Sequence, residues 1–302
     1  MPLRKKKVIT MLKNRLIACL VIKNGIVVQS IGFSRYLPVG KPEIAIEFLN
    51  SWGIDEIIVV DIDASKEGRT ISRDNVRSIA KKCFVPLTVG GGFNSVEEVR
   101  QAIRSGADKV SINAAAIRRP ELITEIAAVL GAQSVIVSMD VKVNQQGKYE
   151  VFISNGKEET GLDPVSWAKK VEELGAGEIL LNSIDRDGTK QGYDLELIKK
   201  VSAAVNIPVI ALGGACHPDH FCAGIEKGKA AAVAAANYFH FTEHSVITTK
   251  AAMKKQKSIH LRLDTYAHYL HLEHQETDGR IRKPSDDYLE EIRFEFHPKE
   301  EI

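Results

Sequence analysis

The sequence has few cysteines, almost no excess charge and no long apolar run, and each shortage excludes a class of protein. Its four cysteines, among 302 residues, are scattered through apolar contexts, which argues against a disulfide framework and suits a reducing compartment. With 41 basic and 39 acidic residues, no global charge draws the chain to nucleic acid or to a membrane surface. No stretch reaches the roughly 20 apolar residues of a membrane helix, and no signal peptide is recognisable. We therefore expect a cytoplasmic protein that binds neither nucleic acid nor membrane.

Short apolar runs alternate along the chain with amphipathic segments. The runs EIIVVDI, SVIVSMDV and IPVIALGG are rich in β-branched residues and too short for helices, so they predict buried strands. Between such runs lie segments of helical period, as in SVEEVRQAIRSG, where Ser95 and Glu98 have capping-box spacing and Gly106 is a stop signal. Eight strand-like runs predict an α/β protein, a closed (β/α)8 TIM barrel; an open doubly wound sheet is the alternative.

An internal repeat favours the barrel. Shifting the chain by 122 residues places identical residue types on one another over two half-chains. We predict two (β/α)4 halves, at about residues 11–130 and 131–250, which an open sheet would not naturally give. The first strand of each half aligns at a shift of 119, which sets Val21 against Asp140. The matching pairs are Pro42 and Pro164, Gly53 and Gly175, Glu56 and Glu178, Asp63 and Asp185, Pro86 and Pro208, Gly91 and Gly213, Gly92 and Gly214, and Gly106 and Gly228.

Two segments fall outside the predicted barrel, which we place at residues 11–265. Residues 1–10 carry the basic run RKKK and are predicted to be a solvated tail rather than a partner-binding arm. Residues 266–302 form a charged extension outside the repeat, and the sequence assigns it no role.

Two histidine-containing segments raise the question of a metal site. The extension contains four histidines, but their spacing is loose and no cysteine accompanies them. The run CHPDHFC at residues 216–222 could bind zinc, but Pro218 suits the first position of a helix and divides the run between a loop and a helix start. We therefore favour structural or ligand-facing roles for this run and expect no metal.

Glycine clusters follow two of the predicted strands at symmetry-related positions. Glycines at the junction of a strand and a helix let backbone N–H groups approach an anion, although tight turns alone would also require them. Two related clusters predict two phosphate sites facing each other across the barrel mouth, and so a bisphosphorylated ligand. The candidate residues are Gly91, Gly92, Gly213 and Gly214, with Asn113 and Asn237 at matching strand ends and Asp187, Gly188 and Thr189 in the loop after the sixth strand.

The motifs VDIDAS, GADKVSIN and SIDRDGTKQGYDLEL, in this order, resemble the cyclase subunits of imidazole glycerol phosphate synthase over about residues 11–264. The resemblance implies a heterodimer with a glutaminase, which docks at the bottom of the barrel and sends ammonia through its core. It further implies that ammonia attacks a bisphosphorylated ribulosyl aminoimidazole carboxamide at the mouth. The products would be imidazole glycerol phosphate and an aminoimidazole ribotide, and no metal or organic cofactor is implied.

Charged residues immediately precede four of the predicted strands. Because the amino ends of parallel strands meet at one face of a barrel, we expect these side chains to form a ring of alternating sign there. Such a ring could simply stabilise the bottom face. The resemblance implies an ammonia gate instead, since all four positions carry the family's residue types. The four residues are Arg15, Glu56, Lys109 and Glu178.

The mouth departs from the pattern of the family. The resemblance implies two aspartates, one acid and one base, at the ends of the first and fifth strands. Asp140 matches the second of these, but Val21 stands at the first position and cannot carry a proton. Because general acid–base catalysis contributes about 10²–10⁴-fold in rate, we expect impaired cyclisation with ligand binding retained. Further differences are Gln29 for a lysine, Ala114 for a threonine, Leu212 for a serine and Asn237 for a serine.

Three functions remain open on the sequence. The chain could serve a histidine-pathway synthase, using Asp140 and a substitute acid. It could conduct ammonia to a separate sugar amidotransferase that forms an acetamidino group on a surface glycan, a branch of the family with an aliphatic residue at the position of Val21. It could also be a scaffold that only binds the glutaminase. The altered mouth slightly favours the second function.

Overall fold

The computed structural model describes residues 13–241, 244–262, 276–277 and 280–281. The predicted tail at residues 1–10 therefore lies outside the described residues. So does the extension at residues 266–302, apart from two short strands, β13 (Glu276–Thr277) and β14 (Arg280–Ile281). The limits predicted for these two segments stay predictions. No helix within the described ranges is long and apolar enough to cross a bilayer.

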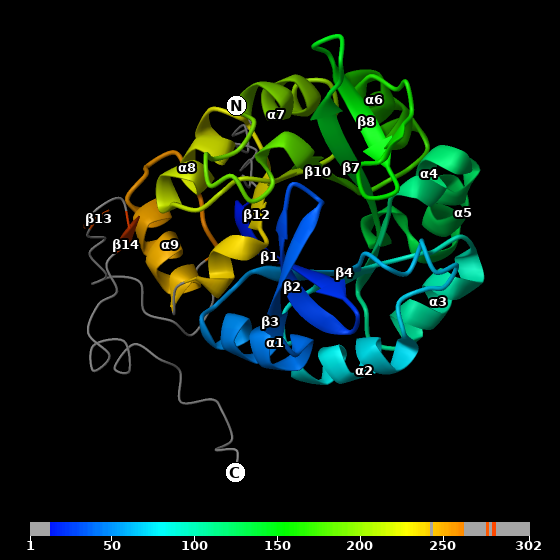
Figure 1. Ribbon diagram of the computed structural model, residues 1–302, viewed down its shortest axis with the longest axis horizontal. Coiled ribbons are helices and arrows are strands. Elements are labelled where there is room, and N and C mark those ends of the chain that lie inside the picture. The colour runs from blue at the N-terminus through cyan, green and yellow to red at the C-terminus, as the bar shows by residue number, and fades with distance from the viewer. Residues whose placement is uncertain (1–12, 242–243, 263–275, 278–279, 282–302) are drawn as a thin grey trace, which may run out of the picture.

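Eight parallel strands close into a barrel (Figure 1). The last strand of the barrel pairs with the first, Arg15 lying opposite Ala232, so the eight-stranded barrel has no free edge. The predicted (β/α)8 barrel is confirmed, and the open doubly wound alternative is wrong. The barrel strands, in the order in which they pair, are β1 (Arg15–Lys23), β4 (Glu56–Asp61), β5 (Leu87–Gly90), β6 (Lys109–Ile112), β7 (Val135–Val143), β10 (Glu178–Ser183), β11 (Val209–Leu212) and β12 (Ala232–Ala235).

Helices surround the barrel and cover its outer face (Figure 1). The predicted capping box at the start of α3 is present, with Ser95 and Glu98 each bonded to the other's backbone. The helices are α1 (Pro42–Ser51), α2 (Arg73–Lys82), α3 (Val96–Arg104), α4 (Ala114–Arg118), α5 (Glu121–Leu130), α6 (Pro164–Glu173), α7 (Leu195–Ser202), α8 (Pro218–Glu226) and α9 (Ser245–Lys254). Short 3-10 turns are η1 (Ala132–Ser134), η2 (Ile184–Arg186) and η3 (Asn237–His240).

The two halves of the chain repeat the same structural plan. The first strand of each half is nine residues long and continues beyond the barrel into an antiparallel hairpin. In these hairpins Val21 pairs with Val28, and Asp140 pairs with Phe152. Val21 and Asp140 thus occupy equivalent places on strands that lie four positions apart in the eight-stranded barrel. The hairpin strands are β2 (Ile26–Ile31) and β3 (Arg35–Gly40) in the first half, and β8 (Tyr149–Ile153) and β9 (Glu158–Glu159) in the second.

Side chains fill the inside of the barrel as well as the layer between strands and helices. Because successive strand residues point to opposite faces, each buried strand supplies both layers, which explains the continuous apolar runs of the sequence. The inner layer is aliphatic and includes two alanines on β12. Its members are Ile17, Cys19, Ile58, Ile136, Leu180, Ile210, Leu212, Ala232 and Ala234.

A buried ion pair ties the last helix to the bottom of the barrel. Lys250 of α9 is fully buried and donates from Nζ to Asp55 (2.5 Å) and to the carbonyl oxygen of Gly53 (2.6 Å). The other carboxylate oxygen of Asp55 accepts from the backbone N–H of Leu16 at 2.7 Å. Burial raises the pKa of Asp55, while the Lys250 charge opposes that rise. The pair therefore joins α9 to the starts of β1 and β4.

We expect Lys250→Ala to lower the free energy of unfolding by about 3–5 kcal/mol, because Asp55 would be left buried without its counter-charge. Urea denaturation followed by circular dichroism would measure the loss. The double variant Lys250→Met with Asp55→Asn should lose less, since neither buried charge remains. A single variant as stable as the unsubstituted protein would contradict this role of the pair.

Candidate functional site at the barrel mouth

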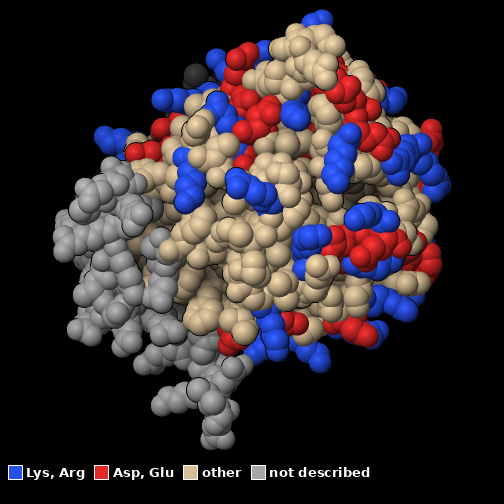
Figure 2. Space-filling model, in the orientation of Figure 1, with Lys and Arg blue, Asp and Glu red and all other residues tan. Residues whose placement is uncertain are grey.

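A cavity of about 510 Å³ opens at the carboxyl ends of the barrel strands. Every barrel strand contributes at least one lining residue, as do both hairpins or the turns beside them. Figure 2 shows Lys and Arg side chains around the mostly uncharged middle of this face. The cationic residues that line the cavity are Lys66, Arg118, Lys157 and Lys190. The location is the one at which barrels of this type bind ligands.

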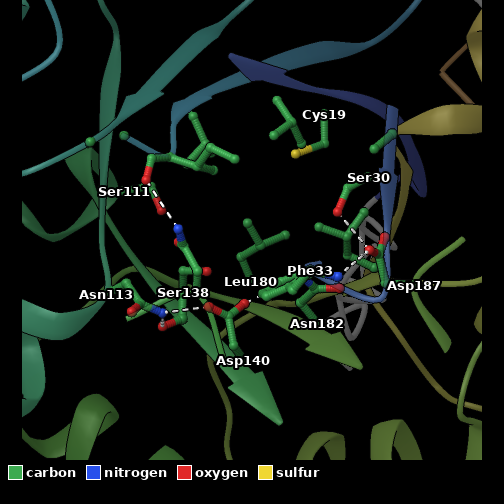
Figure 3. A pocket seen from close by; sticks show the side chains of 18 of the residues that line it. Cys19, Ser30, Phe33, Ser111, Asn113, Ser138, Asp140, Leu180, Asn182 and Asp187 are labelled. Atoms are coloured by element: carbon green, nitrogen blue, oxygen red, sulfur yellow. Dashed lines mark hydrogen bonds between the residues drawn. The ribbon is translucent and has the colours of Figure 1, made fainter. Parts of the chain in front are cut away.

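Asp140 lies in this cavity with an asparagine on each side (Figure 3). Asn113 donates from Nδ2 to one carboxylate oxygen at 3.0 Å, and Asn182 donates to the other at 3.3 Å. Burial raises the pKa of Asp140 to about 7, the charge of Asp187 adds to the rise, and the two amides oppose it. At neutral pH the carboxyl group is therefore present in both protonation states and can either give or take a proton.

The opposite wall of the cavity is aliphatic. Of the two β1 side chains that line it, Val21 has no titratable group, and burial raises the pKa of the Cys19 thiol to about 12. Leu180 and Leu212 complete the apolar floor between the two walls. The cavity thus has a proton-carrying group, Asp140, on the first strand of the second half and none at the equivalent position of the first half, where Val21 lies.

The two glycine turns have matching geometry in the two halves. Gly92 and Gly214 both have positive φ, at 71° and 90°. A Cβ atom on Gly92 would lie 1.9 Å from the carbonyl oxygen of Arg69, and one on Gly214 would lie 2.4 Å from that of Gly192. The backbone geometry alone therefore requires glycine at both positions, whether or not an anion binds there. Gly91 and Gly213 line the cavity beside them, and phosphate binding at these turns stays a prediction.

Two residues predicted to contact ligand are bonded instead to the β2–β3 hairpin. Asp187 accepts from the Ser30 hydroxyl at 2.7 Å, and burial raises its pKa. The Asn237 side chain bonds to both backbone groups of Ser30. Of their neighbours, Gly188 lines the cavity, whereas Thr189 does not and donates its hydroxyl to the Arg186 carbonyl oxygen at 2.8 Å. Ligand contacts by these residues stay predictions.

The four charged residues predicted at the other end of the barrel do come together in a ring. Arg15 donates to Glu56 at 2.8 Å and to Glu178 at 2.6 Å, and Lys109 reaches Glu178 at 2.5 Å and Glu56 at 3.5 Å. Burial acts to raise the pKa of Glu178, but the bonds and charges of Arg15 and Lys109 outweigh it, so the pKa is lowered. Each carboxylate therefore bridges both cations across the bottom of the barrel interior.

The CHPDHFC run has structural partners in the loop before α8 and at its start. His217 caps α8, its Nδ1 accepting from the Asp219 backbone N–H at 3.2 Å. His220 accepts from the Cys216 backbone N–H at 3.2 Å, and the Cys216 thiol donates to the carbonyl oxygen of Lys190 at 3.1 Å. These contacts agree with the structural roles that the sequence favoured. Among the described residues, no group of three or more His, Cys, Asp or Glu side chains is placed to hold a metal ion.

Asn182 is a site residue that the sequence did not single out. It lies opposite Asp140 in the register of β10 and β7, and it is 7% exposed. Within the described part of the chain its side-chain oxygen has no hydrogen-bond partner, so its amide is oriented by Asp140 alone. A polar residue near the carboxyl end of an otherwise apolar strand was the available signal.

Comparison with known proteins gives one consistent result. The histidine biosynthesis protein family matches residues 15–245. A Vibrio vulnificus (strain YJ016) protein named as imidazole glycerol phosphate synthase subunit hisF2 is 49% identical over 259 residues, 86% of this chain and 94% of the relative. The imidazole glycerol phosphate synthase subunit HisF of Alkaliphilus metalliredigens (strain QYMF) is 48% identical over 243 residues, 80% and 96% of the two chains. HisF of Chloroherpeton thalassium (strain ATCC 35110 / GB-78) is 47% identical over 253 residues, 84% and 100% of the two chains.

We expect Asn182→Leu to raise the pKa of Asp140 above its value of about 7, because an amide that stabilises the ionised form is lost. A hydrogen bond to a charged group stabilises it by about 1.5 kcal/mol, and the 3.3 Å bond from Asn182 should contribute somewhat less. Since one pKa unit corresponds to about 1.4 kcal/mol, the pKa of Asp140 should rise by about 0.5–1 unit. Carboxyl ¹³C NMR over a pH series would measure it. Ser138→Ala, a cavity change that leaves both amides in place, is the control. An unchanged pKa in Asn182→Leu would contradict the assignment.

Proposed function

The chain belongs to the histidine biosynthesis protein family, and on that premise we propose that it is a cyclase-type subunit of a glutamine-dependent synthase. It receives ammonia from a glutaminase subunit in a heterodimer, conducts it through the barrel, and uses or delivers it at the mouth. The activity is of the imidazole glycerol phosphate synthase type named for its relatives. It operates in the cytoplasm and requires no metal or organic cofactor.

The path for ammonia is supported by the bottom ring and the interior above it. The ring of Arg15, Glu56, Lys109 and Glu178 closes the bottom of the barrel through ion pairs between buried or nearly buried side chains. Above the ring the interior is aliphatic and therefore admits a small neutral molecule more readily than a cation. Thr88 adjoins Lys109 in strand register, and its buried hydroxyl has no partner among the described residues. That hydroxyl can bond to ammonia passing through the interior.

The ligand we propose at the mouth carries a phosphate at each end. Gly91 and Gly92 face Gly213 and Gly214 across the pseudo-symmetric barrel, and all four line one cavity. Lysine and arginine side chains around that cavity favour an anionic ligand. The cavity size suits a small molecule.

The observation that carries the proposal is the contrast between Asp140 and Val21 in one cavity. Asp140, with its pKa of about 7, can act as either acid or base. Val21 leaves the position opposite Asp140 without a proton carrier, which should slow cyclisation by about 10²–10⁴-fold. Binding of the ligand and passage of ammonia do not depend on that carrier.

The same contrast favours a second candidate function. A subunit that conducts ammonia but cyclises poorly could supply a separate sugar amidotransferase, which forms an acetamidino group on a surface glycan. A non-catalytic scaffold for the glutaminase is a third possibility. The retained Asp140 with its two amide partners argues against the scaffold, because a buried carboxyl group with a raised pKa costs stability at neutral pH and higher.

We expect this gene not to restore growth of a histidine auxotroph that lacks the cyclase subunit, because Val21 removes one proton carrier. Growth rate without histidine is the measurement. Full growth would show that the chain cyclises efficiently and would remove the sugar-amidination candidate.

Val21→Asp should raise cyclase turnover if the mouth otherwise retains the family's chemistry. Val21→Leu, an apolar change at the same position, is the matched control.

We expect Glu56→Ala to uncouple glutamine hydrolysis from ammonia use, because Arg15 and Lys109 would keep only Glu178 as a common partner. The ammonia transferred per glutamine hydrolysed in the assembled heterodimer should fall several-fold. Glu173→Ala, on the exposed surface of α6, removes a carboxylate without touching the ring. Unaltered stoichiometry in Glu56→Ala would refute the gate.

A further inference from the structure

The tip of the β2–β3 hairpin is fastened at two points to the second half of the barrel, at the end of β12 and in the loop after β10. We infer that Asn237 is a positioning residue that, together with Asp187, clasps this hairpin over the cavity and so fixes one of its walls. We call Asn237, Asp187 and Ser30 the hairpin clasp. The inference is independent of the proposed function, because it concerns the shape of the cavity rather than the reaction in it.

The first half of the clasp is a pair of hydrogen bonds from one amide. Asn237 Oδ1 accepts from the backbone N–H of Ser30 at 3.0 Å, and its Nδ2 donates to the backbone carbonyl oxygen of Ser30 at 2.6 Å. The side chain thus pairs with Ser30 as a neighbouring strand would. This pairing needs one donor and one acceptor on the same short side chain. Alanine supplies neither, and a serine hydroxyl is too short to replace both.

The second half of the clasp comes from the loop after β10. One oxygen of the Asp187 carboxylate accepts from the Ser30 hydroxyl at 2.7 Å and from the Phe33 backbone N–H at 3.2 Å (Figure 3). The backbone carbonyl oxygen of Asp187 accepts from the Gly32 N–H at 3.1 Å. A Cβ atom on Gly188 would lie 2.8 Å from the Cα of Ile31, so the two backbones are in direct contact. The loop after β10 therefore contacts each residue of the hairpin from 30 to 33.

The clasped hairpin crosses from β1 towards the other half of the barrel. Its residues Ser30, Phe33 and Tyr36 line the cavity. A Cβ atom on Gly156, in the turn after β8, would lie 3.5 Å from the Phe33 ring, which places the ring against the second hairpin. The Tyr36 hydroxyl donates to the carbonyl oxygen of Phe33 at 2.9 Å, which stiffens the turn. One wall of the cavity is thus built from a segment that belongs to no barrel strand.

All of these bonds join groups of the chain itself. The position of the wall is consequently set by residues 207 and 157 positions away from Ser30 in the sequence, at the ends of β12 and β10. Ser30 is 3% exposed, and the carboxylate that it meets is also buried, so competition from water is weak. Loss of the Asn237 amide should release the Ser30 backbone while leaving the barrel intact.

Hydrogen exchange of the Ser30 amide in the full-length chain tests the inference, together with the rate of tryptic cleavage after Arg35. Two net hydrogen bonds of about 1 kcal/mol each correspond to roughly 30-fold in an opening equilibrium. We therefore expect Asn237→Ala to speed Ser30 exchange by about 10- to 30-fold and to speed the cleavage, with exchange in β5 and β6 unchanged. Ser30→Ala, which loses only the hydroxyl bond to Asp187, should give a smaller increase in the cleavage rate.

Asn155→Ala is the matched control, because Asn155 also lines the mouth but donates to the Ile62 carbonyl oxygen rather than to the hairpin. Unchanged Ser30 exchange in Asn237→Ala would overturn the inference, as would an equal increase in Asn155→Ala. If Asn237→Ala does not fold, Asn237→Ser provides the same comparison with a side chain that can make at most one of the two bonds.

Discussion

The closure of the parallel sheet is the constraint on which the rest of the molecule depends. Pairing of β12 with β1 brings Arg15 opposite Ala232 and leaves the eight barrel strands without a free edge. Closure gathers the amino ends of eight strands at one face and their carboxyl ends at the other. The charged residues before the strands can then meet as one ring, and the polar residues after them can meet in one cavity. In an open sheet of the same strand order, Val21 and Asp140 would be four strands apart along the sheet and would not face each other across one cavity.

Buried carboxyl groups have different partners at the two ends of the barrel, and their pKa values shift in opposite directions. At the bottom, each carboxylate has two cations, and the bonds and charges of Arg15 and Lys109 lower the pKa of Glu178, so this carboxylate stays ionised throughout the neutral range. At the mouth, Asp140 has amides rather than cations as partners, and burial raises its pKa to about 7. A fully paired ion cluster is suited to holding a fixed structure. A carboxyl group close to its midpoint is suited to exchanging protons.

The duplicated backbone carries different side chains in its two halves. The glycine turns keep the same positive φ angles and the same close backbone approach in both halves. The first strands also share their length and their hairpin extension. The first strand of the second half supplies the carboxyl group of Asp140 to the cavity. The first strand of the first half supplies Val21 and the protonated thiol of Cys19 instead. The hairpin of the first half forms a wall of the cavity and is bonded to Asn237 and Asp187.

The sequence by itself determined the strand–helix alternation, the duplication, the ring at the bottom and the opposition of Val21 and Asp140. These follow from local periodicity and from residue type at strand ends, because a closed parallel sheet places equivalent strand ends at equivalent heights. Only the tertiary structure decided the partners of the polar side chains at the mouth. Asn237 bonds to Ser30 and Asn182 bonds to Asp140, although the sequence suggested a ligand for the first and no role for the second. A side-chain hydrogen bond depends on a separation of about 3 Å between residues distant in the chain, and no local pattern encodes that distance.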